Sequence, residues 1–267
     1  MESLRFSLIQ TNLIWEDKQS NLKHFEEKIS TIQEPTNIVV LPEMFSTGFS
    51  MQPEKLAESM DGETVGWMKE IASKKNIILT GSVIIKEDDQ FFNRLLWVLP
   101  NGQVGQYNKR HCFSLAGEDQ HYAPGSKRAI ATVGGWRINL QICYDLRFPV
   151  WARQQLQQDE EGVYPEYDIL LYVANWPASR CHAWKTLLTA RAIENQSYVI
   201  GVNRIGADGN GTAHAGDSMA IDPLGEVLYR LDDKDEVYTV CLQKESLDKA
   251  RERFPFWSDA DSFFISE

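Results

Sequence analysis

The stretch WRINLQICYDLRFP, residues Trp136–Pro149, contains the pattern that decides the fold. A buried strand is predicted up to Cys143, because the residues before it are rich in Ile, Leu and other strand formers. Polar and charged residues follow at once, and a helix is expected to begin near Pro149, since proline favours the first turn of a helix. Cys143 is therefore predicted to lie on the turn between a strand and a helix.

Similar short runs, rich in Ile, Val and Leu and bounded by Gly, Pro, Asn or Asp, recur along the chain and predict further strands. These strands are 6–10, 37–41, 76–85, 91–99, 104–107, 167–174, 197–202, 218–222 and 236–242. Apolar residues at helical spacing predict helices that contain 22–32, 65–72 and 184–191. The alternation of strands and helices predicts an α/β layered fold.

The length of the chain fits one large α/β domain, since it has 267 residues and 43% of them are hydrophobic. No internal repeat, low-complexity tract or linker interrupts it. We predict a single domain over residues 1–267, in which roughly residues 245–267 form a peripheral C-terminal extension.

The charge balance excludes several classes of partner. With 27 Lys and Arg against 38 Asp and Glu, the formal net charge is −11. Neither nucleic acid nor an anionic membrane surface is an expected partner, because both attract basic proteins. An anionic substrate would need local cations, because the field of the whole chain repels it.

The cysteines and the N-terminus indicate where the protein works. The charged N-terminal residues leave too short an apolar run for a signal peptide, and no stretch approaches about 18 continuous apolar residues. The four cysteines are far apart and form no C-x-x-C pair. They are expected to be reduced thiols of a cytoplasmic protein. They are Cys112, Cys143, Cys181 and Cys241.

Glu43 is the first candidate for catalysis. It follows the apolar run Val39-Val40-Leu41 and Pro42, so it is expected at the carboxyl end of a strand, where open α/β sheets place ligands. A carboxylate there suits a general base. The alternative is a carboxylate that caps the next segment.

Lys109 is the second candidate, in the segment Tyr107-Asn108-Lys109-Arg110-His111. Basic residues after a strand usually decorate a surface. A lysine that points into a pocket could instead stabilise a developing oxyanion. Glu118, nine residues later, could pair with this lysine or orient a neighbour.

Cys143 is the third candidate, because a strand-to-helix turn can expose a nucleophile beside backbone N–H groups. The alternative is an inert buried thiol. No G-x-S-x-G, H-E-x-x-H or phosphate-binding loop competes with it. A Cys–His pair with His111 or His121 stays open. The Gly-rich stretch 206–211 is interpreted as a turn near the rim of a pocket.

Together, L-P-E-M-F around Glu43, Y-N-K-R-H around Lys109 and Q-I-C-Y-D-L-R-F-P around Cys143 resemble the nitrilase, or carbon–nitrogen hydrolase, superfamily. Further segments resemble its omega-amidase branch, and the likeness extends from residue 4 to about 261. These segments are L-A-G-E at 115–118, Y-V-A-N-W-P at 172–177, A-R-A-I-E-N-Q at 190–196 and G-D-S at 216–218.

The resemblance implies an α-β-β-α sandwich that pairs into dimers, so that layers stack across subunits. It also implies a Glu–Lys–Cys catalytic set of Glu43, Lys109 and Cys143, with Glu118 as a second pocket glutamate. The branch is similar to enzymes that remove the terminal amide of 2-oxoglutaramate and related dicarboxylate monoamides. No metal or organic cofactor is implied.

Four residues are candidates for binding the substrate. The backbone N–H of Tyr144 would help to hold the oxyanion, and Arg147 is the nearest cation in sequence for a substrate carboxylate. Arg147 could instead form a structural ion pair with Asp145. Trp176 and Phe113 could line the pocket or belong to the core, and the same alternatives hold for Phe45.

Rival functions use the same scaffold. Within the superfamily they are an N-carbamoyl amide hydrolase, a deaminated-glutathione amidase and a nitrilase, which would share the catalytic set and differ in the pocket. From another class, the chain could be a non-catalytic interaction protein. The presence of all three residues, Glu43, Lys109 and Cys143, argues against that last alternative.

Overall fold

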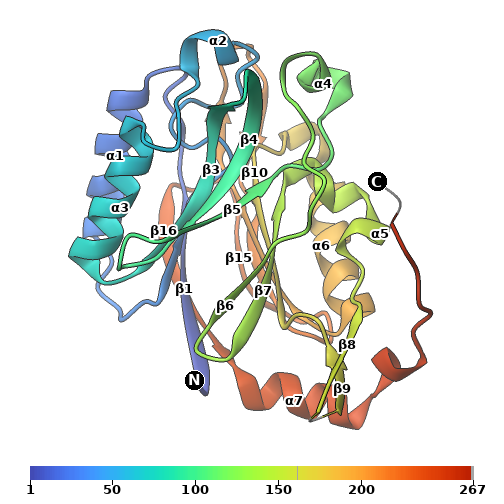
Figure 1. The fold of residues 1–267 in the computed structure, drawn as a ribbon. Helices are drawn as coiled ribbons and strands as arrows, with labels where there is room; N and C mark the ends of the chain where they lie inside the picture. The colour runs from blue at the N-terminus through green and yellow to red at the C-terminus, as the bar shows by residue number, and fades with distance from the viewer. Residues whose placement is uncertain (161, 266–267) are drawn as a thin grey trace.

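The computed structural model describes residues 1–160 and 162–265, which form two six-stranded sheets covered by helices (Figure 1). The first sheet has the order β16-β1-β2-β3-β4-β5. Its strands are β1 (Ser3–Gln10), β2 (Ile38–Val40), β3 (Ile78–Glu87), β4 (Gln90–Val98), β5 (Val104–Asn108) and β16 (Glu236–Gln243). Strands β1, β2 and β3 run parallel to one another.

The second sheet has the order β15-β14-β11-β10-β7-β6, with a parallel centre of β7, β10 and β11. Its strands are β6 (Ile130–Val133), β7 (Trp136–Ile142), β10 (Ile169–Ala174), β11 (Tyr198–Asn203), β14 (Ser218–Ile221) and β15 (Val227–Leu231). Two small hairpins pair β8 (Leu156–Asp159) with β9 (Gly162–Pro165), and β12 (Ile205–Ala207) with β13 (Ala213–Ala215).

The three longest helices cover the outer faces of the sheets. Helices α1 (Lys18–Ser30) and α3 (Glu63–Lys75) lie on the first sheet, and α6 (Cys181–Asn195) lies on the second (Figure 1). The other helices are α2 (Pro53–Leu56), α4 (Glu118–His121), α5 (Pro149–Ala152) and α7 (Lys244–Arg253). Short 3-10 turns are η1 (Ser114–Ala116), η2 (Cys143–Arg147), η3 (Ala178–Arg180) and η4 (Phe256–Asp259). The predicted α/β layers are confirmed, in the order helix, sheet, sheet, helix.

Strand β10 shows how the sequence makes these layers. Its side chains alternate between the two faces of the sheet, as the pleat of a strand requires. Leu171 belongs to the core between the two sheets. Its neighbours Leu170 and Tyr172 pack in the core beneath α6 instead. All six residues of β10 are buried, so the strand is a continuous apolar run, as expected for a parallel strand covered on both sides.

Every strand and helix predicted from the sequence is present in the structure. The errors of the prediction are elements that it left out. The sequence interpretation missed β6, β8, β9, β12, β13 and β15, because strands of three to five residues are too short to show a clear pattern of burial. It also missed α7, whose sequence KESLDKARER is mostly charged. The division into one domain with an extension from about residue 245 stays a prediction. Within that extension, Leu247 is fully buried in the core between the sheets. Residues 266–267 of the extension lie outside the described residues.

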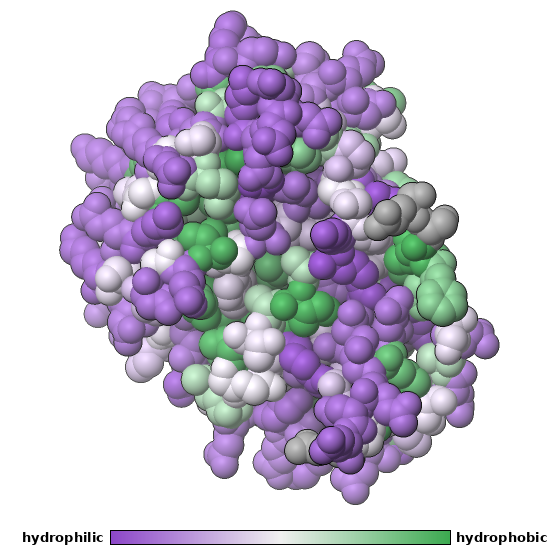
Figure 2. Space-filling view, in the orientation of Figure 1, coloured by the Kyte–Doolittle hydropathy of each residue, from purple (hydrophilic) through white to green (hydrophobic). Residues whose placement is uncertain are grey.

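The surface matches the composition. Figure 2 shows that most of one face is hydrophilic, with apolar residues exposed in separate patches. Among the described residues, no helix is both long and apolar enough to cross a membrane.

A buried ion-pair cluster fastens α7 to the second sheet. Asp168, just before β10, accepts hydrogen bonds from Lys244 at 3.1 Å and from Arg251 at 2.9 Å, both from α7. Arg137 of β7 completes the cluster at 3.2 Å. Burial disfavours the charged form of this carboxyl, but the three cations outweigh burial and lower the pKa of Asp168.

We predict that Asp168→Asn lowers the free energy of unfolding by about 3 kcal/mol, because three cations lose their buried partner. The folded-state pKa of Asp168 is lowered, so its contribution is present above the unfolded-state pKa and is lost as the pH falls through the folded-state pKa. The difference between the two proteins should therefore shrink below about pH 4. Urea unfolding at several pH values measures it.

The matched control is Glu245→Gln, which breaks the exposed pair between Glu245 and Lys249 of the same helix. This change should leave the unfolding midpoint almost unchanged, because exposed ion pairs contribute little. Equal stability of Asp168→Asn and the wild type at neutral pH would contradict the role assigned to the cluster.

Candidate active site

Four strands end at one edge of the sandwich, and each is followed by a polar residue that points into a common site. Glu43 follows β2 and Lys109 follows β5, both in the first sheet. Cys143 follows β7 and Asn175 follows β10, both in the second sheet. The site therefore lies at the carboxyl ends of strands from both sheets, where α/β folds place ligands.

A buried charge cluster lies at the base of this site. The Nζ atom of Lys109 donates to Glu43 Oε1 at 2.9 Å and to Glu118 Oε2 at 2.8 Å. All three side chains are 1% exposed or less. The predicted pairing of Lys109 with Glu118 is confirmed, and Glu43 shares the same ammonium group.

The charges in this cluster shift one another's ionisation. Burial opposes the charged form of Lys109, but Glu118 and Glu43 outweigh it and raise the pKa of the ammonium well above its usual range. Burial also raises the pKa of Glu118, against the attraction of Lys109 and with the repulsion of Glu43. Lys109 is thus a permanent cation between two carboxyl groups.

Two asparagines that the sequence interpretation missed hold the carboxylates in place. Asn93 of β4 donates from Nδ2 to Glu43 Oε1 at 2.8 Å and to Glu118 Oε1 at 3.2 Å. The backbone N–H of Asn175 donates to Glu43 Oε2 at 2.8 Å. The sequence contains a pattern that could have identified both asparagines. Asn93 is a polar residue inside an apolar strand, and Asn175 stands directly after one, as Glu43 does.

Cys143 begins η2 with a left-handed backbone, at φ +42°. This conformation is strained for a residue with a side chain, and such strain is concentrated at functional sites. The predicted strand–turn–helix order is confirmed, with η2 between β7 and α5. Met44, next to Glu43, has the same type of backbone at φ +43°. Both turns therefore bend sharply where a candidate catalytic side chain leaves its strand.

The Cys143 thiol is protonated in the resting site. Burial raises its pKa well above the usual value, and the negative charge of Glu43 raises it further. The positive charge of Lys109 acts in the opposite direction and does not compensate. A thiolate at this position consequently requires a base to take the proton as it forms.

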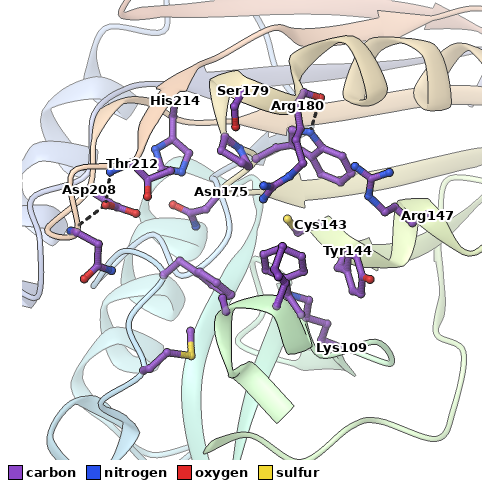
Figure 3. A pocket seen from close by; sticks show the side chains of 18 residues that line it. Lys109, Cys143, Tyr144, Arg147, Asn175, Ser179, Arg180, Asp208, Thr212 and His214 are labelled. Carbon is purple, nitrogen blue, oxygen red and sulfur yellow. Dashed lines mark hydrogen bonds between the residues drawn. The ribbon is translucent and has the colours of Figure 1, made fainter. Parts of the chain in front are cut away.

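A cavity of about 430 Å³ opens above the thiol (Figure 3). Its volume fits a small-molecule ligand. Six residues predicted from the sequence line it, namely Lys109, Phe113, Cys143, Tyr144, Arg147 and Trp176. The other two predicted residues, Glu43 and Glu118, do not line the cavity. They accept hydrogen bonds from Lys109.

Aromatic side chains form part of the wall. The ring of Phe113 meets that of Tyr144 edge to face, with centroids 4.9 Å apart. Trp176 serves both as pocket wall and as core, because it lines the cavity and also packs on Trp184 at 5.5 Å. Phe45 belongs to the core only, where its ring meets Phe25 at 5.4 Å.

The alternative ion pair between Arg147 and Asp145 is wrong. Asp145 is fully buried and accepts from the hydroxyl of Tyr107 at 2.7 Å and from the backbone N–H groups of His111 and Ile142. Its bonding capacity is thus used within the fold. Arg147 instead lies over the Trp176 ring, 5.0 Å from the centroid.

The structure gives no support to the alternative Cys–His pair. The ring of His111 is 2.8 Å from Asp145 Oδ1 and stacks on Phe148, and neither His111 nor His121 lines the cavity. The histidine that does is His214 of β13. Burial and the nearby charge of Arg204 lower its pKa, so this imidazole is neutral near pH 7.

Further pocket residues come from segments that carried no clear signal. Arg180 ends η3, and Asp208, Asn210 and Thr212 belong to the hairpin of β12 and β13. The predicted turn at 206–211 does lie at the pocket rim. Within the described residues, no three His, Cys, Asp or Glu side chains are grouped so as to hold a metal ion.

Comparison with known proteins agrees with this geometry. Residues 5–252 match the family described as carbon-nitrogen hydrolase. The chain is 43% identical to Omega-amidase YafV of Escherichia coli, over 98% of this chain and 99% of that protein. It is 29% identical to a 2-oxoglutaramate amidase of Bacillus subtilis, over 95% and 96% of the two chains.

Solved structures give the same result. A crystal structure from Xanthomonas campestris, a CN-hydrolase superfamily protein with an arsenic adduct in its active site, is 42% identical. It superposes with a TM-score of 0.96 over 100% of both chains. Saccharomyces cerevisiae Nit3, a member of the nitrilase superfamily, is 24% identical and shares the fold with a TM-score of 0.81. This chain therefore belongs to the carbon–nitrogen hydrolase family of the nitrilase superfamily, in the branch that contains the omega-amidases.

Proposed function

We propose that this protein hydrolyses the terminal amide of small dicarboxylate monoamides, such as 2-oxoglutaramate, to the acid and ammonia. The observation that carries the proposal is the buried cluster of Glu43, Lys109 and Glu118 directly behind the Cys143 thiol. The relatives named omega-amidase and 2-oxoglutaramate amidase support the substrate class. The cavity of about 430 Å³ fits a molecule of this size.

The first half of the reaction forms a thioester. Glu43 accepts the thiol proton while the sulfur of Cys143 attacks the amide carbonyl carbon. The carbonyl oxygen becomes an oxyanion, which Lys109 and the backbone N–H of Tyr144 stabilise. The protonated Glu43 then gives its proton to the amide nitrogen, the carbon–nitrogen bond breaks, and ammonia leaves.

The second half releases the acid. Water enters the place of ammonia, and Glu43 takes one of its protons as the oxygen attacks the thioester carbonyl. The carbon–sulfur bond breaks, and the proton held by Glu43 returns to the thiolate of Cys143. One carboxyl group thus alternates between base and acid, which suits a leaving group that departs only when protonated.

Glu118 and Asn93 have supporting roles in this proposal. Two carboxylates share the ammonium of Lys109, so Glu118 fixes the position of that cation without contacting the pocket. Asn93 donates to both carboxylates and sets the distance between them. Both residues would position the groups that react.

Other activities of the superfamily form the alternative, namely hydrolysis of N-carbamoyl amides, deaminated glutathione or nitriles. They would use the same Glu43, Lys109 and Cys143 and differ only in the pocket. A non-catalytic interaction protein is a weaker alternative, because a buried charge cluster behind a strained cysteine is costly to maintain without a use.

We further propose that the protein is a cytoplasmic homodimer. All four cysteines are free thiols, which suits a reducing compartment. Apolar residues of α6, of the β14–β15 turn and of the start of β15 are about half exposed: Ile193 at 53%, Leu224 at 49% and Val227 at 49%. This apolar surface would be covered by the second subunit.

Substitution of the reacting groups tests the mechanism. We expect Cys143→Ala to abolish ammonia release, and Glu43→Gln to lower kcat by roughly a hundredfold to ten-thousandfold. Both variants should keep the wild-type circular dichroism spectrum. Substantial turnover by a folded Cys143→Ala protein would exclude the thioester route.

A substrate panel tests the activity. Ammonia release should be fastest from 2-oxoglutaramate and succinamate, and slow from glutamine, N-carbamoyl amino acids and simple nitriles. Preference for nitriles or carbamoyl compounds would overturn the proposed substrate class while keeping the nucleophile.

The bridging role of Asn93 predicts that Asn93→Ala lowers kcat by roughly tenfold to a hundredfold with little change in KM, because the carboxylates lose one of the two side chains that donate to both of them. The control is Gln90→Ala, at the exposed start of the same strand. Equal kinetics of Asn93→Ala and the wild type would contradict the bridging role.

For the oligomer, light scattering should give twice the mass of the chain, and Ile193→Glu should halve that value, because a charge would be buried at the interface. Val163→Glu changes a residue of similar exposure on β9 and should not alter the mass. A monomeric wild-type protein would contradict the dimer.

A further inference from the structure

Two arginines at the pocket lack a carboxylate partner. Six other arginines form ion pairs: Arg94, Arg128, Arg137, Arg191, Arg230 and Arg251. Within the described part of the chain, Arg147 and Arg180 form none, although both line the cavity. In a protein of net charge −11, unpaired guanidinium groups in one pocket create a local positive region.

The positions of these two arginines differ. Figure 3 shows the Arg180 side chain extending toward Cys143, whereas Arg147 lies at the edge of the pocket. Arg147 rests on Trp176, which also packs into the core. Arg180 lies over the ring of Phe113, 5.1 Å from the centroid, and Phe113 itself is part of the pocket wall. Arg180 is therefore the arginine that extends into the cavity toward Cys143.

The fold holds Arg180 in this place. The Nε1 atom of Trp176 donates to the carbonyl oxygen of Arg180 at 2.8 Å, which closes the loop between β10 and α6. The aromatic ring below the guanidinium limits its motion by a cation–π contact. No side-chain hydrogen bond of Arg180 exists among the described residues, so its N–H donors stay available. A planar guanidinium with free donors matches a carboxylate, which it can bind through two parallel hydrogen bonds.

The acidic residue at the pocket rim does not neutralise this cation. Asp208 accepts the backbone N–H groups of Asn210 at 2.8 Å and Thr212 at 2.9 Å within its own turn. It forms no ion pair with Arg180. The negative charge at the hairpin and the positive charge at Arg180 would instead orient an anionic substrate, with its carboxylate away from Asp208.

We propose that Arg180 binds the distal carboxylate of the substrate and so selects anionic amides over neutral ones. The proposal rests on the amidase function proposed above and names the residue that recognises the remote charge. Binding there would fix the far end of the molecule and leave the amide carbonyl over Cys143. Remote binding of this kind improves catalysis by orienting the reacting group.

The test compares succinamate with butyramide, which has a methyl group in place of the carboxylate. The wild type should prefer succinamate in kcat/KM. Arg180→Gln should lower kcat/KM for succinamate by roughly tenfold to a hundredfold, as expected for a lost hydrogen bond to a charged group. Its kcat/KM for butyramide should stay within about threefold of the wild type. Butyramide hydrolysis also reports whether the variant is folded.

Three further variants sharpen the result. Arg180→Lys should lose part of the preference, because lysine keeps the charge without the planar pair of donors. Arg147→Gln should reduce the preference less than Arg180→Gln does. Arg253→Gln is the matched control, since it removes an exposed arginine that lies over Phe254, 4.9 Å from the ring centroid, on α7. It should keep the wild-type preference.

Several outcomes would overturn the inference. Equal losses for succinamate and butyramide in Arg180→Gln would make Arg180 a structural residue. Loss of the preference in Arg147→Gln alone would assign the carboxylate to Arg147. A wild type that hydrolyses both amides equally well would exclude carboxylate selection while the amidase function stands. A wild type that releases ammonia from neither amide nor from 2-oxoglutaramate would refute the proposed function itself.

Discussion

The ammonium group of Lys109, buried between Glu43 and Glu118, is the constraint on which the rest of the site depends. Three charges lie in an interior that excludes water, and each is tolerable only because the others are within hydrogen-bonding distance. The segments after β2 and β5 and helix α4 must therefore converge. Asn175 joins the second sheet to the same cluster, because its backbone N–H donates to Glu43.

This cluster also determines the resting state of the nucleophile. Burial and the charge of Glu43 keep the proton on Cys143, whereas Lys109 stays charged. The protonated thiol is a weaker nucleophile than the thiolate. In the proposed reaction the thiol becomes reactive only when a carbonyl group is placed where Lys109 can compensate the developing charge. Selectivity then depends on the pocket that presents the carbonyl.

The pocket contains both paired and unpaired charged side chains. Lys109 at its floor is paired with two carboxylates, whereas Arg147 and Arg180 in its wall form no ion pair with any described residue. The overall charge of −11 disfavours the approach of any anion, so in the proposed function the guanidinium groups inside the cavity would attract an anionic amide locally. The ring of Phe113 lies below the Arg180 guanidinium, and the ring of Trp176 lies below that of Arg147.

The sequence by itself predicted the α/β layers and placed Glu43 and Cys143 at the ends of strands. Apolar runs such as β10 encode buried strands, and a polar residue directly after such a run marks Glu43 and Cys143, because strand ends in an α/β fold face a common edge. Asn93 was visible in the sequence as a polar residue within an apolar strand, but only the tertiary structure brought it to Glu118 and brought Arg180 and His214 to the pocket. It also decided that Asp145 bonds to Tyr107 and leaves Arg147 unpaired. Pairings of this kind depend on which loops pack together, and spacing along the chain does not encode them.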